Sequence, residues 1–462
     1  MNRNSKQKVF SCCFFCAFAL GLVISLMCGC NNGKIETPED SKYLKDFHVD
    51  NFDQSESLLK MDDLALYVDY STCTKLGQNA AFFQEIEQSF VTKTKHYWSI
   101  KGASITEEDL SEQGTYARLR NISEVNYAEL KKAADMMASS NSESILVTDC
   151  EYFTQTMAKG NDNNPYLVDA FKKWILRGYD IHIISEPYVE RNNGKDYNKK
   201  RFYIIFTDDR DKSNIYGQIV RTVHFDNYPN VDQFHLSATH PGLFGNGNNS
   251  SEQHEILMSK SQGYGMYEVE DWAGCDWGTI EEMIVNAVDE NTGNALPNGD
   301  PAITMAIDKN SFGCYSIDEV GVRVYNINQE YMDYYQAKSG RSKTPKISLN
   351  SLYELENFML VDNKTFKKNG NINILFNQQW FDPSVLEGNP NNYLKVDLII
   401  NKVSSTFNEH QGFFEFESIV RPGEMNNSVV ASINQCINDA DVIAKMTNQV
   451  VYSIYIKTEK SK

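Results

Sequence analysis

Several signatures of common enzyme classes are missing from this chain. It has no Gly-x-Ser-x-Gly elbow, no glycine-rich phosphate loop and no His-Glu-x-x-His motif, which argues against the enzyme classes that these motifs mark. Beyond Cys30 it also lacks Cys-x-x-Cys pairs, and its eight histidines are scattered. His235, His240 and His254 follow no standard metal spacing, so we expect solvated loop histidines here and no zinc site.

Positive charge is scarce relative to negative charge. The chain has 44 lysines and arginines against 62 acidic residues, which gives a formal charge of −18. Residues 1–29 contribute Arg3, Lys6 and Lys8 and no acidic residue, so the charge of the rest changes from −18 to −21. Such an excess argues against nucleic acid or anionic lipid as a partner of the folded part, and it favours the binding of cations.

Long apolar runs are absent except at the N-terminus. Val9 to Met27 is apolar, follows the three basic residues, and ends in Cys28-Gly29-Cys30. This pattern is typical of a bacterial lipoprotein signal peptide over residues 1–29, with Cys30 as the lipidated residue. The alternative is an uncleaved anchor helix, because the run is nearly long enough to span a bilayer. The sequence thus predicts a protein anchored in the bacterial cell envelope, at the outer membrane, with its periplasmic or surface orientation left open.

Changes in composition and in the strand and helix patterns divide the rest of the chain into four segments. Residues 30–58 are polar and of mixed charge, which predicts a tether. Residues 59–225 alternate strand and helix patterns, as in an α/β domain with a Rossmann-like sheet and flanking helices. Residues 226–345 read as a loop-rich region with some strands, and residues 346–462 read as a β-sandwich-like domain. The predicted fold class is therefore α/β, followed by a β-rich C-terminal half.

Two apolar runs that end in aspartate are the most informative features of the α/β segment. Leu64 to Val68 leads into Asp69-Tyr70-Ser71-Thr72-Cys73, and Ile145 to Val147 leads into Thr148-Asp149-Cys150. Each run is typical of a buried parallel strand, and ligands of open α/β sheets bind where such strands end. Aspartates and hydroxyls at that edge are ligands suited to a hard cation.

The elements around these strands support a mostly parallel sheet. Helical periodicity is expected over 79–95, 127–138, 166–176 and 215–223, and strands over 97–100 and 179–184. A turn at Asn192 to Asp196 predicts an antiparallel hairpin between 181–189 and 201–207. In the C-terminal half, 279–288 and 432–446 are the segments with a helical pattern.

The pair of motifs resembles the von Willebrand factor A (VWA) fold and its metal-ion-dependent adhesion site. That family has Asp-x-Ser-x-Ser after its first strand and Thr-Asp-Gly after its fourth, whereas this chain has Cys73 and Cys150 at the last position of each motif. The resemblance covers about residues 60–190. It implies a site for Mg²⁺ (or Ca²⁺ or Mn²⁺) made by Asp69, Ser71, Ser123 and Asp149, with Thr148 as a lesser ligand.

The same resemblance implies a place for two cysteines. In a VWA-like sheet the first and fourth strands are neighbours, so Cys73 and Cys150 would lie on adjacent loops, within reach of a disulfide. Two free buried thiols are the alternative.

A phosphatase is the second function that the residues suggest. Enzymes of the haloacid-dehalogenase type use a strand-end aspartate nucleophile, a Ser or Thr after a second strand, and acidic metal ligands after a last strand. Asp69, Thr148 and Asp208-Asp209 occur in that order. However, Ser71 occupies the position of the required second acid, which serves as the proton donor to the leaving group. We therefore expect no catalysis.

The sequence thus predicts an envelope lipoprotein with a degenerate VWA-type adhesion site. Its abundance of Asn, Lys and Tyr is similar to that of lipoproteins from Bacteroidetes. Its expected role is binding or assembly with another envelope protein or a surface ligand, with membrane attachment through the lipid.

Overall fold

The computed structural model describes the chain between residues 38 and 460, apart from a set of internal segments. The description leaves out residues 1–37, 53–58, 78–79, 123–127, 152–162, 240–256, 259–263, 275–279, 287–302, 307–313, 341, 377–390, 420, 448 and 461–462. Cys30 and Ser123 therefore lie outside the described residues. Over the described part, no helix has both the length and the apolar character needed to cross a membrane.

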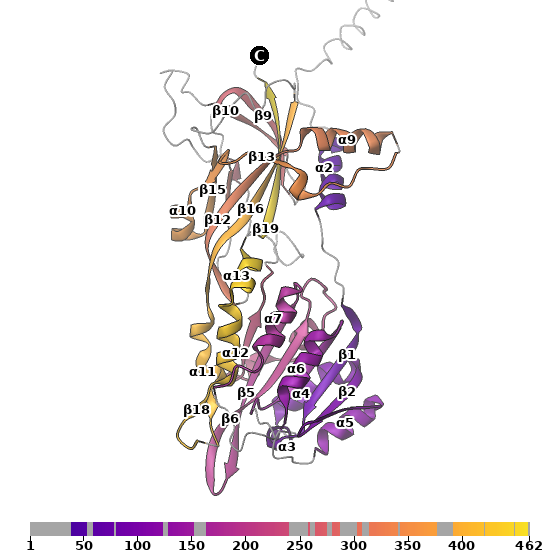
Figure 1. Ribbon diagram of the computed structural model, residues 1–462, viewed down its shortest axis with the longest axis vertical. Helices are drawn as coiled ribbons and strands as arrows, with labels where there is room; N and C mark the ends of the chain where they lie inside the picture. The colour runs from indigo at the N-terminus through magenta and orange to yellow at the C-terminus, as the bar shows by residue number, and fades with distance from the viewer. Residues whose placement is uncertain are drawn as a thin grey trace, which may run out of the picture.

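The molecule is elongated and has two bodies, an α/β body and a β-rich body (Figure 1). The α/β body contains a seven-stranded mixed sheet with flanking helices, and the β-rich body contains antiparallel sheets. The predicted fold class, α/β with a β-rich C-terminal half, is confirmed.

The seven-stranded sheet has the strand order β3-β2-β1-β4-β6-β5-β7. Its strands are β1 Lys60–Asp69, β2 Thr94–Lys101, β3 Ser104–Glu108, β4 Ser142–Thr148, β5 Asp180–Asn192, β6 Lys195–Thr207 and β7 Asp232–Leu236. Strand β1 pairs in parallel with β2 and with β4, as predicted for the two strands that end in aspartate. Strand β6 is antiparallel to both β4 and β5. Its C-terminus therefore lies at the end of the sheet where β4 and β5 begin.

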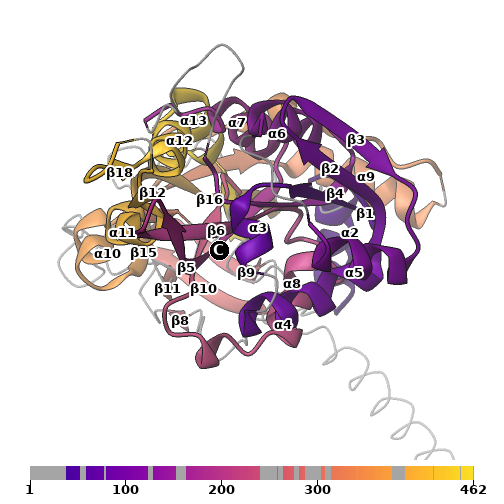
Figure 2. The ribbon, with the colours of Figure 1, turned by 90° about the horizontal axis from the view of Figure 1, so that it is seen from below.

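Both faces of this sheet are covered by helices, as Figure 2 shows. On β1, Leu66 and Val68 pack on one side with helices α4 Ala81–Phe90 and α8 Ile215–Thr222. Tyr67 points to the other side, towards helices α6 Leu130–Ser139 and α7 Val168–Leu176. Because successive side chains of a strand alternate between faces, an unbroken apolar run is what a strand covered on both faces requires. Helix α5 Glu112–Arg120 lies on the same side as α4 and α8, because its Leu119 is buried in the apolar cluster that these helices share.

The predicted hairpin is confirmed. Strands β5 and β6 pair from Asp180 opposite Thr207 to Asn192 opposite Lys195, which leaves a two-residue turn. Asn193 and Gly194 have φ angles of 52° and 81°, the left-handed values that such a turn requires. The hairpin extends beyond the other strands at the end of the molecule farthest from the β-rich body (Figure 1).

The β-rich body has a six-stranded and a four-stranded antiparallel sheet. The first contains β9 Tyr264–Gly274, β10 Ile280–Asn286, β12 Tyr315–Asn326, β13 Tyr353–Glu354, β16 Asn391–Ser405 and β19 Val450–Lys460. The second contains β8 Leu257–Met258, β11 Ile303–Ala306, β14 Met359–Val361 and β15 Asn371–Phe376. Helices α9 Asn328–Ser339 and α10 Asn363–Asn369 complete it. The helix predicted over 279–288 is wrong, because β10 forms a ladder with β9 and the pairing overrides local propensity.

The predicted segment boundaries need three corrections. Strand β12 falls in the predicted intermediate region 226–345, separate from the predicted segment 346–462. It pairs along its length with β16, so strands from both predicted segments form the β-rich body. The tether predicted over 30–58 is wrong for helix α2 Pro38–Asn51, because Phe47 is fully buried against Tyr331, Tyr334 and Tyr455 of the β-rich body.

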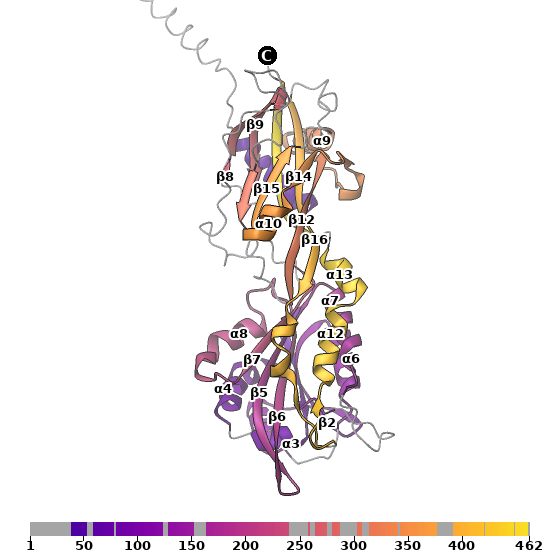
Figure 3. The same cartoon turned by 90° about the vertical axis from the view of Figure 1, so that its left-hand side faces the viewer.

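The third correction concerns the segment that returns to the α/β body. It comprises helices α11 Gln411–Phe414, α12 Ser428–Ile437 and α13 Ala440–Met446 and the short strands β17 Phe416–Glu417 and β18 Met425–Asn426. Figure 3 shows α12 and α13 beside α7, where the Ser432 hydroxyl accepts the Leu167 N–H at 3.3 Å. The helical pattern predicted over 432–446 is confirmed, but it completes the α/β body and not the β-rich one.

Candidate functional site

The two predicted strand-end motifs meet at one edge of the sheet. Val68 pairs with Val147, so Asp69 at the end of β1 lies level with Thr148 at the end of β4. The Thr148 hydroxyl donates to Asp69 Oδ2 at 2.8 Å, and the Ser71 hydroxyl donates to Asp149 Oδ2 at 3.1 Å. Three of the predicted ligands, Asp69, Ser71 and Asp149, are therefore brought together. We call this cluster, with Thr148, the strand-end site.

The strand-end carboxylates are buried. Asp69 is 0 % exposed and Asp149 is 3 % exposed, and Asp69 Oδ1 has no hydrogen-bond partner among the described residues. Burial, followed by the charge of Asp149, raises the pKa of Asp69 well above its usual value. Burial also raises the pKa of Asp149, although the charge of Lys199 opposes this shift. A buried carboxylate oxygen without a partner is costly, and its presence calls for a proton or a cation.

A buried lysine lies beside the strand-end site. Lys199 of β6 is fully buried, and its ammonium group pairs with the Glu151 carboxylate and donates to the Glu417 carbonyl at 3.1 Å. Burial raises the pKa of Glu151 to about 7. Three carboxylates, those of Asp69, Asp149 and Glu151, thus share one ammonium group. With all groups ionised the cluster carries two uncompensated negative charges, which a divalent cation would neutralise.

A second buried ion pair holds the adjoining helix α3 Thr72–Gly77. The Arg201 guanidinium donates to Glu186 Oε2 at 2.8 Å from Nε and 2.5 Å from Nη2, and the Tyr203 hydroxyl donates to the same oxygen at 2.9 Å. The guanidinium lies directly against Gly77, where a Cβ atom would come within 1.2 Å of Nη1. Any larger residue at this point of contact would require the guanidinium to move.

The predicted disulfide is not formed. Cys150 is a free, buried cysteine, and burial raises the pKa of its thiol well above the usual value. The structure describes the backbone of Cys73 within α3 but not its side chain. Cys150 has a φ angle of 58°, so the chain adopts the left-handed turn that favours glycine, the residue of the VWA motif at this position.

The phosphatase arrangement does not assemble. Strand β6 is antiparallel to β4, and Phe202 of β6 lies opposite Thr148. Asp208 follows six residues later, which corresponds to about 20 Å of extended chain away from the strand-end site. Asp208 and Asp209 therefore lie at the opposite end of the strands from Asp69.

At that opposite end of the sheet, two histidines and an aspartate form a cluster that the sequence did not predict. His182 of β5 is the cross-strand partner of His235 of β7, and their rings stack with centroids 4.3 Å apart. His182 Nε2 lies 3.0 Å from both carboxylate oxygens of Asp209, and His235 Nε2 lies 3.4 Å from Asp209 Oδ2. The three residues are close enough to hold a metal ion. We call these three residues the histidine site.

Electrostatics distinguish the two histidines. Burial, together with the charge of His235, lowers the pKa of His182. Burial would also lower the pKa of His235, but its hydrogen bond to Asp180 and the charges of Asp180 and Asp209 outweigh burial and raise it. The prediction that His235 lies in a solvated loop is wrong, because it belongs to β7; His240 and His254 lie outside the described residues.

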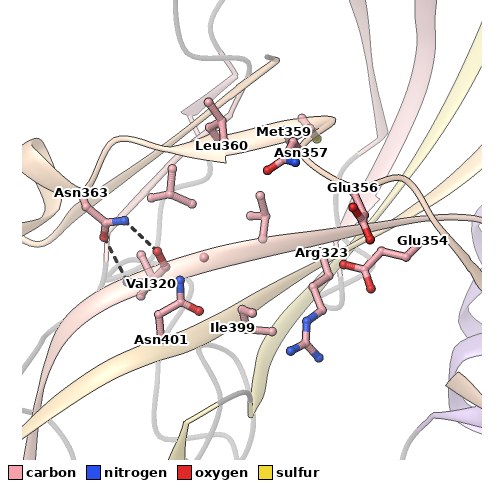
Figure 4. A pocket seen from close by; sticks show the side chains of 13 residues that line it. Val320, Arg323, Glu354, Glu356, Asn357, Met359, Leu360, Asn363, Ile399 and Asn401 are labelled. Atoms are coloured by element: carbon pink, nitrogen blue, oxygen red, sulfur yellow. Dashed lines mark hydrogen bonds between the residues drawn. The ribbon is translucent and has the colours of Figure 1, made fainter. Parts of the chain in front are cut away.

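The β-rich body has an open groove of about 430 Å³ between β12 and β14 (Figure 4). The Asn363 side chain spans its end by bonding both the N–H and the carbonyl of Val320, and Arg323, Glu354 and Glu356 line its other end. The residues that line this groove include neither histidine nor cysteine.

Comparison of the chain with protein-family models, with curated proteins and with solved structures finds no match.

Proposed function

We propose that this chain is a lipid-anchored binding protein of the bacterial cell envelope whose strand-end site holds a divalent cation. The observation that carries the proposal is Asp69 Oδ1, a fully buried carboxylate oxygen without a hydrogen-bond partner in the described structure. When all of its groups are ionised, the surrounding cluster carries two uncompensated negative charges. The residues that would hold the cation are Asp69, Ser71 and Asp149, with the Thr148 hydroxyl behind them.

The donor chemistry favours Mg²⁺, with Mn²⁺ or Ca²⁺ as related alternatives. Carboxylate and hydroxyl oxygens are the only side-chain donors among these four residues, and hard cations prefer oxygen ligands. Few protein ligands are present, and Mg²⁺ commonly keeps several of its water molecules.

The position of the strand-end site in the molecule suits a binding role. Helix α2, the first described element after the lipidation signal, packs on the β-rich body, whereas α3, which follows Ser71 directly, lies at the far end of the α/β body (Figure 1). The β5–β6 hairpin projects from the same end (Figure 1). A protein anchored through Cys30 would present this end away from the membrane.

Apolar side chains are exposed at this far end. Leu76 of α3, Val189 of the hairpin and Met425 of β18 are 49 %, 59 % and 41 % exposed. Exposed apolar side chains at this end support a contact with another protein. We infer that another envelope protein or a surface ligand contacts this end. Because these carboxylates are buried, the cation would not touch the partner directly. It would neutralise the carboxylates and order the loops of the strand-end site that the partner contacts.

The test of the cation proposal is a Mg²⁺ titration of the purified protein, followed by thermal unfolding. Mg²⁺ at one hundred times its dissociation constant should add about 2.7 kcal/mol to the free energy of unfolding. Asp69→Asn should abolish this response, and it should unfold at a higher temperature than wild type without Mg²⁺, because it removes a buried, unpaired charge.

Asp226→Asn is the matched control, because Asp226 is an exposed aspartate of the same body. It should keep the full Mg²⁺ response. A wild-type protein that does not respond to Mg²⁺, Mn²⁺ or Ca²⁺, or an Asp69→Asn variant that responds like wild type, would rule out the proposed cation site.

The lipid anchor has a separate test. Cys30→Ala should eliminate incorporation of labelled fatty acid and should move the protein out of the membrane fraction, because the acceptor thiol is lost. Cys28→Ala is the matched control and should remain labelled. Labelling that persists in Cys30→Ala would show that the anchor lies elsewhere.

A further inference from the structure

We propose that the histidine site, together with Asp180, is a closed site for a zinc-type transition-metal ion that fastens strand β7 to the α/β body. This inference does not depend on the strand-end site, which lies at the opposite end of the sheet and offers oxygen ligands only. It also reverses the expectation from the scattered histidines that the chain has no zinc site.

The backbone brings the two histidines together without any local sequence motif. His182 and His235 are directly opposite each other in the antiparallel pairing of β5 and β7. Their ring planes differ by only 9°, and the rings are stacked face to face. Both Nε2 atoms lie beside the Asp209 carboxylate, which follows the end of β6. Three separate chain segments therefore contribute one ligand each.

The distances between these donor atoms fit a tetrahedral metal site. Zinc–nitrogen and zinc–oxygen bonds of about 2.0–2.1 Å place tetrahedral ligands roughly 3.4 Å apart. His182 Nε2 lies 3.0 Å from Asp209 Oδ2, and His235 Nε2 lies 3.4 Å from the same oxygen. To bind one ion, the two stacked rings would have to turn so that both Nε2 lone pairs point towards it.

Asp180 would supply the fourth ligand after a shift of its side chain, since His182, His235 and Asp209 are the three described residues whose donor atoms already lie close to one another. Its Oδ1 lies 2.9 Å from His235 Nε2, and its Oδ2 accepts the backbone N–H of Asp209 at 2.9 Å. One ring nitrogen of His235 is thus within 3.4 Å of two carboxylates, although a single N–H can donate well to only one of them. A metal ion bound to that nitrogen would satisfy both carboxylates at once.

The surroundings position the ligands and leave a way in. The Tyr216 ring stacks on His182 with centroids 3.4 Å apart, and its hydroxyl donates to Gln233 Oε1 at 2.9 Å. The side chains of His182 and Asp180 are 6 % and 7 % exposed, whereas those of His235 and Asp209 are 28 % and 35 % exposed. An ion can therefore reach the site from the outer side of β7.

Ligand type selects the ion. Two imidazoles with two carboxylates suit Zn²⁺ better than Mg²⁺ or Ca²⁺, which prefer oxygen alone. Four protein ligands close the coordination shell, as in structural zinc sites, whereas catalytic sites keep one position open. The proposed role is therefore structural.

The site lies where the chain leaves the α/β body. Immediately after β7, the Ser237 carbonyl accepts the Cys314 thiol at 3.4 Å, and the Ala238 carbonyl accepts the Gln449 side chain at 3.4 Å. Cys314 and Gln449 adjoin strands β12 and β19 of the β-rich body. A metal ion that holds His235 would thus hold the edge strand that leads into the contacts between the two bodies.

The test is calorimetric titration of metal-free protein with Zn²⁺, with Co²⁺ as a spectroscopic probe. We expect one Zn²⁺ per chain and visible absorption bands of four-coordinate Co²⁺ that Zn²⁺ removes. His235→Gln and Asp209→Asn should each weaken Zn²⁺ binding by about 100-fold or more, since even residues behind the ligands contribute 10–100-fold. Both replacements are at partly exposed positions, so the metal-free fold should persist.

His224→Gln is the matched control. His224 also bonds a carboxylate, that of Glu85, but its side chain is 76 % exposed and it has no second histidine beside it. This variant should bind Zn²⁺ like wild type. Failure of wild type to bind Zn²⁺, or unchanged affinity in both His235→Gln and Asp209→Asn, would overturn the proposal. Asp69→Asn should leave Zn²⁺ binding intact, so the two cation proposals can fail separately.

Discussion

Replacing Arg201 by methionine should lower the free energy of unfolding by about 3–5 kcal/mol, as expected when one partner of a buried ion pair is removed. Arg201 is fully buried, and the side chain of its partner Glu186 is 6 % exposed. In the methionine variant, the buried Glu186 carboxylate would lose the guanidinium donors. Of the donors described above, it would keep the Tyr203 hydroxyl. It would also remove the cation that lies 4.8 Å from the centre of the Phe83 ring.

Denaturant unfolding followed by tryptophan fluorescence measures this loss, because Trp174 is buried in the same body. The double variant Arg201→Met with Glu186→Leu should be more stable than Arg201→Met alone, since it removes the stranded charge. Arg191→Met is the control. The side chains of Arg191 and of its partner Asp196 are 74 % and 65 % exposed. The loss of this ion pair should lower the free energy of unfolding by less than about 1 kcal/mol. A similar cost for both single variants would contradict the burial argument.

Replacing Glu143 by glutamine should make the protein more stable at pH 8 by about 3 kcal/mol and change little at pH 4. Glu143 is 1 % exposed at the start of β4. Burial raises its pKa from 4.5 to about 7, although its hydrogen bonds from the Thr207 hydroxyl and the Ile215 N–H oppose that shift. Between these two values the folded state holds a proton that the unfolded state has lost.

The sign of the pH dependence follows from this difference. The folded state binds more protons than the unfolded state between about pH 4.5 and 7, so Glu143 lowers stability progressively as the pH rises through that window. Glutamine cannot ionise and still offers an acceptor oxygen to Thr207 and Ile215. The difference between variant and wild type should therefore grow from pH 4 to pH 7 and then level off.

Comparing the two proteins at each pH cancels the other groups that titrate in this range, such as Glu151. The control is Glu112→Gln, an exposed carboxyl on α5, whose difference from wild type should stay within about 0.5 kcal/mol. A stability difference for Glu143→Gln that is the same at pH 4 and pH 8 would show that burial of this carboxyl does not control the pH dependence.

The two cation proposals assign different tasks to the two ends of one sheet. The strand-end site has buried carboxylates and hydroxyls at the end of the molecule that the anchor would hold away from the membrane. The histidine site lies at the end where β7 leads towards the β-rich body. A hard cation at the first and a zinc-type ion at the second would act on partner binding and on the attachment of the edge strand, respectively.

Local sequence patterns predicted many elements of the α/β sheet correctly. The prediction of a mostly parallel sheet is wrong, because among the described strands only β1–β2 and β1–β4 pair in parallel, whereas β6 inserts between β4 and β5 and makes both of those pairings antiparallel. Helices α4, α6, α7 and α8 and the β5–β6 hairpin follow from periodicity and turn residues, which depend on neighbours along the chain. The pairing of β1 with β4 is implied by the resemblance to the VWA fold. Gly178, which follows α7, has a φ angle of 89° and donates its N–H to the Ile175 carbonyl. The same reasoning failed for β10, since its strand character comes from pairing with β9.

The sequence by itself determined that Asp69 and Asp149 end two buried parallel strands, because unbroken apolar runs followed by polar residues specify strand ends. Only the tertiary structure decided that Asp69 Oδ1 is buried without a partner, that Cys150 stays free, and that Asp208 lies at the opposite end of the strands. It alone brought His182 and His235 together, since they meet through the register of two strands far apart in the chain. Register depends on how whole strands pack, and no local spacing records it.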